Sequence, residues 1–308
     1  MQVDVPLELD PWPNGVPSYP QLIDDLDGDG WLDVVAGEGG GCIANCLQAP
    51  SQWVHQPATF GLWPGGPTGF ALAPTVQWRS TVQYETLRVA GVVGDTDGDG
   101  VRELVLAAEW ASDPQLEEGR VFVVPLSGGM PGVPSWTIQG LFAGVHLGRR
   151  VQPLGDVDGD GYDDLLLGLP YGGAVAPSAD GRAIAYYGGP TGYRQVPDWV
   201  SPALGYQAGE ALAAGDLDSD GYADAFVAAP AEGRGQVWGF RGGATGLSAI
   251  PSWTLSAAGD PDAGWFGRVI RVIPDVDGDG YGDSASTPTL SCAALPGTLV
   301  SGGDCDDG

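Results

Sequence analysis

Positive charge is scarce in this chain of 308 residues. Only 12 Lys and Arg oppose 40 Asp and Glu, which gives a formal net charge of −28 at pH 7. Proteins that bind nucleic acid neutralise phosphates with cationic side chains, so this balance argues against a nucleic-acid partner. An apolar run of 18 residues is also missing, so the sequence predicts no membrane insertion.

Catalytic motifs are missing as well. The sequence holds no G-x-S-x-G elbow, no H-E-x-x-H pair and no P-loop. We interpret His55, expected on a loop, and His146, at a strand start, as structural or surface residues. Four acids outside the repeated motifs described below have no evident partner for acid–base chemistry: Glu109, Glu117, Glu118 and Glu210. We therefore expect no enzyme.

Cysteine is rare and falls in two local pairs, Cys42 with Cys46 and Cys292 with Cys305. An even number in local pairs is typical of disulfides in an oxidising compartment, with four free thiols as the alternative. Zinc is disfavoured because neither histidine has ligand spacing. The N-terminal MQVDVPLELD has neither the basic nor the apolar region of a signal peptide, so we expect any such segment to have been removed or left out.

Glycine and proline, in contrast, are abundant, with 52 and 26 residues, and they predict many turns and few long helices. Between them lie short apolar runs rich in Val, Leu, Tyr and Trp, which are typical of strands. Four such runs recur in order. In the third repeat they read RRVQPL, DLLLGLP, AIAYYGG and VPDWV.

An acidic motif, D-x-D-x-D-G-x-x-[DE] with Ser at the fourth position of one copy, separates the first two runs of each repeat. Its five copies start at Asp25, Asp95, Asp156, Asp216 and Asp275, which lie 70, 61, 60 and 59 residues apart. A period of this size indicates a propeller or solenoid, and four short strands per period are the content of a propeller blade. We predict an all-β fold, a β-propeller with four complete four-stranded blades and a partial fifth.

The repeats resemble the FG-GAP repeats of integrin α chains over about residues 17–303. Phe266-Gly267 and Leu147-Gly148 stand at the F-G position, and Ala228-Ala229-Pro230 and Gly168-Leu169-Pro170 stand at the G-A-P position. Propellers of that family usually have seven blades, whereas this chain shows four and a part. The resemblance implies calcium ions that brace the turn between the first two strands of a blade and do not contact a ligand.

Calcium takes six to eight oxygen ligands from carboxylates, carbonyls and water. The motif offers carboxylates at positions 1, 3, 5 and 9, a backbone carbonyl at position 7, and a glycine for the sharp turn at position 6. The expected ligands are Asp25, Asp27, Asp29, Trp31 and Asp33; Asp95, Asp97, Asp99, Val101 and Glu103; Asp156, Asp158, Asp160, Tyr162 and Asp164; Asp216, Asp218, Asp220, Tyr222 and Asp224; and Asp275, Asp277, Asp279, Tyr281 and Asp283. Five Ca²⁺ ions would add ten positive charges and bring the formal charge from −28 to −18.

The chain divides into residues 1–274, with four blades, and residues 275–308. The second segment also resembles the MopE-type metal-binding repeat of bacterial surface proteins, which implies a Cys292–Cys305 disulfide. It further implies Asp304, Asp306 and Asp307 as possible ligands. The alternating residues 3–9 form a candidate strand that would complete the fifth blade and close the ring. With an open ring, edge strands would favour a homo-oligomer or polymer.

We expect a secreted adhesion or scaffold module at a cell surface, with structural calcium and with a protein or carbohydrate partner. A self-assembling surface layer or filament is a variant. A lectin-like propeller is the alternative, with Trp53, Trp63 and Trp110 as candidate contacts. An enzyme is a third possibility because some polysaccharide lyases use propellers. The insert Glu38–Pro57 is the best candidate for a recognition surface, because repeat-specific insertions lie on loops.

Overall fold

The computed structural model describes residues 20–26, 29–38, 42–44, 54–55, 59–70, 74, 76–79, 88–112, 115–128, 130–172, 180–257 and 265–272. These residues fall into two compact units, residues 1–151 with 191–193 and residues 152–190 with 194–308. Each unit is built on two antiparallel sheets, and each sheet corresponds to one repeat of the sequence.

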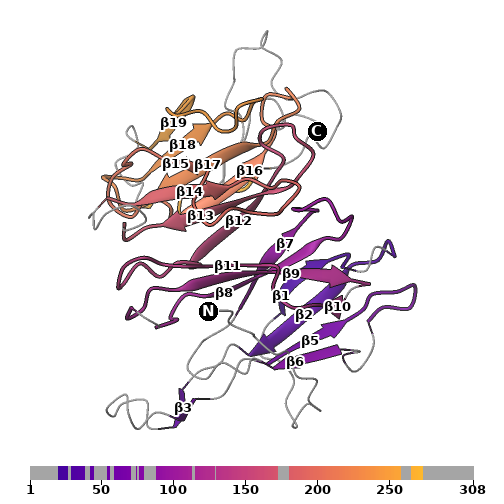
Figure 1. Cartoon of the computed structure of the whole chain (residues 1–308). Coiled ribbons are helices and arrows are strands. Elements are labelled where there is room, and N and C mark those ends of the chain that lie inside the picture. Colours follow the sequence, from indigo (N-terminus) through magenta and orange to yellow (C-terminus); the bar gives the residue numbers. More distant parts are fainter. Residues whose placement is uncertain are drawn as a thin grey trace, which may run out of the picture. The chain divides into compact units, whose positions relative to one another are not determined.

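In the first unit, consecutive strands pair in chain order within each sheet (Figure 1). The first sheet consists of β1 (Pro20–Asp24), β2 (Asp33–Glu38), β5 (Thr59–Trp63) and β6 (Val76–Arg79). The second consists of β7 (Arg88–Val93), β8 (Glu103–Ala108), β9 (Arg120–Ser127) and β11 (Trp136–Gln139), and the short β10 (Met130–Pro131) also pairs with β9.

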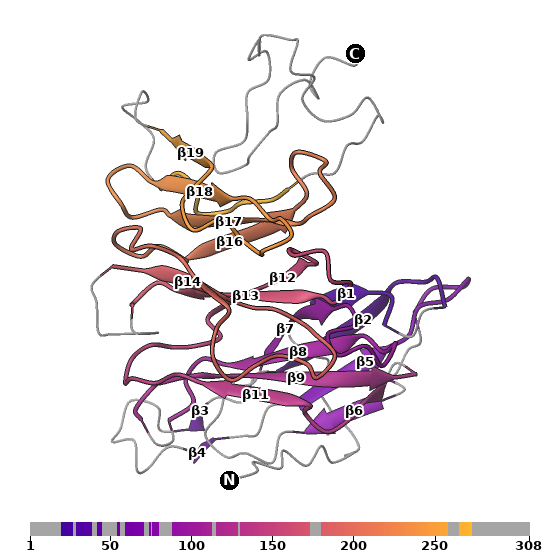
Figure 2. The same ribbon diagram turned by 45° about the horizontal axis from the view of Figure 1, so that its top comes forward.

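The second unit repeats the pattern twice, as the sheet of β16–β19 shows clearly in Figure 2. Its first sheet has β12 (Arg150–Gly155), β13 (Asp164–Leu169), β14 (Arg182–Tyr186) and β15 (Trp199–Val200). Its second has β16 (Ala211–Gly215), β17 (Asp224–Ala229), β18 (Gln236–Phe240) and β19 (Trp253–Ser256).

The predicted all-β fold with four four-stranded units is therefore confirmed, and no helix occurs among the described residues. Four meandering sheets of this kind are consistent with a β-propeller. The fifth acidic motif, the N-terminal candidate strand and all of residues 273–308 lie outside the described residues, so ring closure stays a prediction. Residues 265–272, which precede that motif, form turns and no strand.

The insert of the first repeat contains a small ribbon of its own, in which β3 (Cys42–Ala44) pairs with β4 (Val54–His55). We expected His55 on a loop, but it ends β4 because the insert folds back on itself. Cys46, Cys292 and Cys305 lie outside the described residues, so both disulfides stay predictions.

The second strand of a sheet is its most buried element. Every residue of β8, β13 and β17 is buried. A strand covered on both faces needs a continuous apolar run rather than alternation, as the DLLLGL sequence of β13 provides. Two of the recurring tryptophans, Trp136 and Trp199, are also buried, at 6% and 7% exposure, which agrees with their predicted role in packing the sheets.

At the F-G position of the repeat, the backbone passes very close to the glycine that precedes the third strand of the sheet before it. Gly119 directly precedes β9, and a Cβ there would overlap the backbone of Leu147, which enters the next sheet. The same overlap occurs between Gly181 and Ala208 and between Gly235 and Phe266. Leu147, Ala208 and Phe266 are each followed by a glycine at positive φ, so the F-G resemblance reflects a close approach that side chains would block.

Candidate metal centres

The acidic motifs connect the first and second strands of the sheets. They lie between β1 and β2, β7 and β8, β12 and β13, and β16 and β17. We call them loops 1 to 4. Asp27 and the whole fifth motif, with Asp275, Asp277, Asp279, Tyr281 and Asp283, lie outside the described residues.

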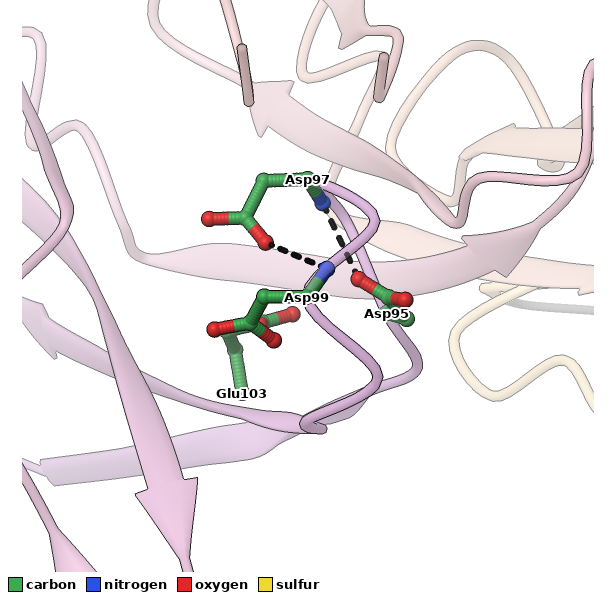
Figure 3. Close-up of side chains that lie close together, drawn as sticks. All are labelled: Asp95, Asp97, Asp99 and Glu103. Atoms are coloured by element: carbon green, nitrogen blue, oxygen red, sulfur yellow. Dashed lines mark hydrogen bonds between the residues drawn. The ribbon is translucent and has the colours of Figure 1, made fainter. Parts of the chain in front are cut away.

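Loop 2 gathers four carboxylates. One oxygen from each of Asp95, Asp97, Asp99 and Glu103 lies within 4.8 Å of the others. Figure 3 shows these side chains around the turn, with hydrogen bonds from the Asp97 N–H to Asp95 and from the Asp99 N–H to Asp97. The arrangement is that expected from the sequence for positions 1, 3, 5 and 9.

Loops 3 and 4 repeat the cluster with positions 1, 3 and 9. Asp156, Asp158 and Asp164 meet the same 4.8 Å limit in loop 3, and Asp216, Asp218 and Asp224 meet it in loop 4. The structure thus brings together carboxylates that are separated by up to eight positions in the sequence. That they bind a metal ion stays a prediction.

The acid at position 1 organises the turn through backbone N–H groups. In loop 3, Asp156 Oδ1 accepts hydrogen bonds from Gly159 N and Asp160 N at 2.6 and 3.2 Å, and its Oδ2 accepts one from Gly161 N at 2.9 Å. Asp95 is held in the same way in loop 2. Burial raises its pKa, but four backbone N–H groups outweigh burial and lower the pKa below the ordinary value.

The acid at position 5 fixes the next part of the loop. Its Oδ1 accepts the N–H of the residue at position 7 in all four loops, at 2.7–3.0 Å: Trp31 to Asp29, Val101 to Asp99, Tyr162 to Asp160 and Tyr222 to Asp220. The glycine between them takes φ of 80–91° in every loop, which favours glycine because it lacks a Cβ.

The acid at position 9 is buried in all four loops, and in loops 1, 3 and 4 it bridges two distant parts of its sheet. Asp164 is fully buried, and it accepts the N–H of Val157 and the N–H of Gly188, both at 2.8 Å. Gly188 belongs to the Gly-Gly pair after the third strand. Asp33 binds Leu26 and Gly65 in the same way, and Asp224 binds Leu217 and Gly242.

Burial makes the position-9 carboxylates hard to charge. It raises the pKa of Glu103 to about 8, that of Asp164 to about 7 and that of Asp224 to about 6, and neighbouring loop carboxylates add to each shift. A bound dication favours the charged form of a carboxylate and so opposes this effect. These acids therefore fit a site built around a cation.

Successive loops touch within each unit. In the first unit, the Arg102 guanidinium donates to the backbone carbonyl of Asp25, so loop 2 holds the start of loop 1. In the second unit, Ala223 N donates to the Asp156 carbonyl at 3.0 Å, and Gly243 N donates to the Val157 carbonyl at 2.9 Å. The two loops of each unit are thus joined directly by hydrogen bonds.

The donor set fits calcium. It consists of carboxylate oxygens alone, which are ligands that calcium prefers. No sulfur or imidazole belongs to the three clusters, which argues against zinc at these positions. Sequence reasoning missed the bridge from position 9 to the Gly-Gly pair, because the pair lies 18 to 32 residues further along the chain.

A second cluster of side chains lies at the other end of the second sheet, where the turn from β8 to β9 meets His146. Trp110 is 43% exposed, and its ring meets His146 edge-on at 4.6 Å. His146 takes a φ of 51° and places Nε2 3.7 Å from Glu117 Oε2. Glu118, one of the four acids outside the motifs, is buried with its Oε1 3.8 Å from Arg120 Nη2, and it accepts the N–H of Gln115.

Comparison with known proteins supports an FG-GAP repeat protein. Residues 208–240 match the FG-GAP repeat family. The chain is 37% identical to human integrin alpha-IIb over 151 residues and 31% identical to chicken (Gallus gallus) integrin alpha-V over 206 residues. These matches cover 44% and 62% of the chain but only 14% and 19% of the relatives, so the chain spans less than a fifth of their length.

Similar solved structures include two rhamnogalacturonan lyases, YesW and the PL11 enzyme of Bacillus licheniformis. Identities are 16% and 15% and TM-scores are 0.40 and 0.41, with 86% of this chain and 57% of each lyase covered. The expectation that this chain is no enzyme was wrong as an exclusion, because these neighbours are enzymes. Missing sequence motifs could not exclude activity, since catalytic groups converge from separate loops. At these TM-scores the likeness carries no argument for a particular reaction.

Among the described residues, no helix is long and apolar enough to cross a membrane.

Proposed function

We propose that this chain is an extracellular module for adhesion or scaffolding, in which calcium ions brace the first turn of each sheet. The resemblance to integrin α chains supports adhesion to a partner at a cell surface. Homo-oligomerisation through edge strands belongs to the same proposal. Calcium is structural in this proposal, so its binding contributes to the free energy of folding.

The observation that carries the proposal is the repeated cluster in loops 2, 3 and 4. Carboxylates within 4.8 Å of one another repel strongly unless a cation lies between them. The same loops anchor the sheets, because each position-9 acid joins the turn to the third strand or to the start of the loop. A cation at this point would stabilise both the turn and the sheet.

The test is elemental analysis of protein purified without chelator, combined with thermal melts in calcium and in EGTA. We expect four or five calcium ions per chain and a melting temperature that falls by more than about 10 °C on chelation, because each ion is lost from the folded state. Refilling with calcium should restore the melt. Magnesium at the same concentration is the control, and it should restore much less because it demands octahedral sites with several waters.

Protein without bound calcium, or a melt that EGTA leaves unchanged, would contradict the proposal. Calcium that binds without any effect on melting would also contradict it, because the ions would then not brace the fold.

Saccharide binding is a second candidate, favoured by the exposed Trp110. An aromatic ring at the surface can stack on a sugar face, and Glu109, Glu117 and Arg149 supply hydrogen-bonding groups nearby. This group lies at the end of the second sheet opposite to loop 2. On a glycan array, Trp110→Ala should lose binding, whereas Val133→Ala, which alters a residue 66% exposed in the turn after β10, should not.

A further inference from the structure

A cationic side chain from outside loop 4, that of Arg241, forms an ion pair with one of the loop carboxylates. Arg241 Nη2 lies 2.6 Å from Asp218 Oδ2. Asp218 stands at position 3 of the loop, and it belongs to the cluster with Asp216 and Asp224. The Asp218 side chain is 20% exposed and that of Arg241 is 50% exposed, so only the carboxylate end of the ion pair is largely shielded from water. The contact is an ion pair, whose strength depends on charge and on the exclusion of water.

The guanidinium is held in place by its surroundings. Arg241 follows β18 directly, and its backbone N–H donates to Ser248 Oγ at 3.1 Å while its carbonyl accepts the Ser248 N–H at 2.8 Å. Its guanidinium carbon lies 5.1 Å from the centre of the Trp253 ring in β19. The next residue, Gly242, donates to Asp224 of the same loop. Both the backbone and the side chain of Arg241 are therefore fixed beside loop 4.

The other sheets have no cation at the equivalent place. The residue before the Gly-Gly pair is Pro64 in the first sheet, Ser127 in the second and Tyr187 in the third. The side chain of Tyr187 instead reaches the neighbouring sheet of its unit, where its hydroxyl oxygen accepts the Leu247 N–H at 2.8 Å. The arginine is thus a particular feature of loop 4.

We propose that Arg241 is a built-in counter-ion of loop 4, which partly neutralises the cluster and makes this loop fill with calcium at a higher concentration than loop 3. This inference rests on the proposed calcium function. A dication entering loop 4 must either displace the guanidinium from Asp218 or share that carboxylate with it. In both cases the positive charge of Arg241 opposes binding of the ion.

The physical consequence is a graded response to calcium. Loop 3 has three clustered carboxylates of the same motif positions, and it therefore binds calcium without this competition. Loop 4 keeps an ordered turn at low calcium, because Arg241 compensates part of its charge. The fourth sheet would then hold its shape at calcium concentrations that leave loop 4 empty of metal.

The experiment is a calcium titration followed by the backbone amide signals of Gly161 and Gly221 in two-dimensional NMR of the full chain. These glycines occupy position 6 of loops 3 and 4, and each donates its N–H to the position-1 acid of its own loop. In the unaltered chain we expect Gly221 to shift at a calcium concentration about tenfold higher than Gly161, because the charge of Arg241 opposes the ion in loop 4 only.

Two variants separate charge from shape. Arg241→Met removes the charge and keeps an unbranched apolar side chain next to Trp253, so the Gly221 midpoint should fall about tenfold, toward that of Gly161. Arg241→Lys keeps the charge and should leave the midpoint within about threefold of the unaltered value. Gly161 serves as the internal control in every titration, and its midpoint should not change.

An equal or lower midpoint for Gly221 than for Gly161 in the unaltered chain would overturn the inference. An unchanged midpoint in a folded Arg241→Met variant would overturn it as well, and Arg241→Gln provides a second neutral variant if Met disturbs the sheet. A titration in which neither glycine moves contradicts calcium binding itself, so failure of the proposed function is distinguishable from failure of this inference.

Discussion

At the scale of single residues, the position-9 acid has a role that differs from those of the other loop acids. Asp158, at position 3, is partly exposed, and its pKa is raised by burial and by neighbouring loop acids. Asp164, at position 9, is fully buried and accepts two backbone N–H groups. Removing Asp164 therefore removes structural hydrogen bonds as well as a proposed metal ligand, whereas removing Asp158 chiefly removes a proposed ligand.

We predict that Asp164→Ala destabilises the protein at every calcium concentration at which it melts cooperatively. Two buried N–H groups would lose their acceptor, at about 1–3 kcal/mol each. Asp158→Ala, the matched variant, should be destabilised only where calcium is bound, and without calcium it should be at least as stable as the unaltered chain, because it relieves repulsion in the metal-free loop. Thermal melts over a calcium series measure both effects. Parallel curves for the two variants would contradict the distinct role of Asp164.

The sequence could predict which acids gather, because a short loop brings its own alternating side chains together. It could not predict the acceptor role of Asp164 toward Gly188, or the pairing of Arg241 with Asp218, since these contacts join segments 24 and 23 residues apart. Such contacts depend on the register between the second and third strands. That register follows from the packing of the whole sheet rather than from the loop motif.

At the scale of elements, the Gly-Gly pair is a junction between a strand and a loop. In the first sheet, Gly65 donates its N–H to Asp33 Oδ1 at 2.8 Å, and a Cβ on Gly65 would overlap the carbonyl oxygen of Leu32. Gly66, its neighbour, would place a Cβ 3.8 Å from the Gly69 oxygen, which is an ordinary contact. The two glycines of the pair therefore differ in what they tolerate.

We predict that Gly65→Ala destabilises the protein by about 3 kcal/mol or more, because the backbone of Leu32 cannot move aside without breaking the turn. Gly66→Ala should change the free energy of unfolding by less than about 1 kcal/mol. Denaturant unfolding at saturating calcium measures both variants. Equal effects would show that the close approach at Gly65 does not constrain the sheet.

Sequence periodicity located the strands well. In the third repeat, the runs RRVQPL and DLLLGLP before and after the acidic motif correspond to β12 and β13, with ends that differ by one residue. The insert was less predictable. Its Cys- and Gln-containing sequence shows no clear alternation of apolar and polar residues, so the pairing of β3 with β4 could not be predicted from it.

At the scale of the whole molecule, charge and fold are linked. The acids at positions 1, 3, 5 and 9 of the five motifs account for 20 of the 40 acidic residues of the chain. A net charge of −28 destabilises a folded chain through repulsion, and the proposed calcium ions would relieve that repulsion where it is most concentrated. The clustering of acids could be predicted from the sequence, but the ion pair between Asp218 of loop 4 and Arg241 could not.

We predict that salt partly substitutes for calcium. In EGTA, raising sodium chloride from about 0.05 to about 0.5 M should raise the melting temperature by roughly 5 °C or more, because the Debye length shortens below the size of an acidic loop. In saturating calcium the same change should have a much smaller effect, since the loop charges are already compensated. Sucrose at matched osmolality, which does not screen charge, is the control. A melting temperature in EGTA that is independent of salt would mean that loop repulsion does not limit the stability of the metal-free fold, and calcium would then have to act through geometry alone.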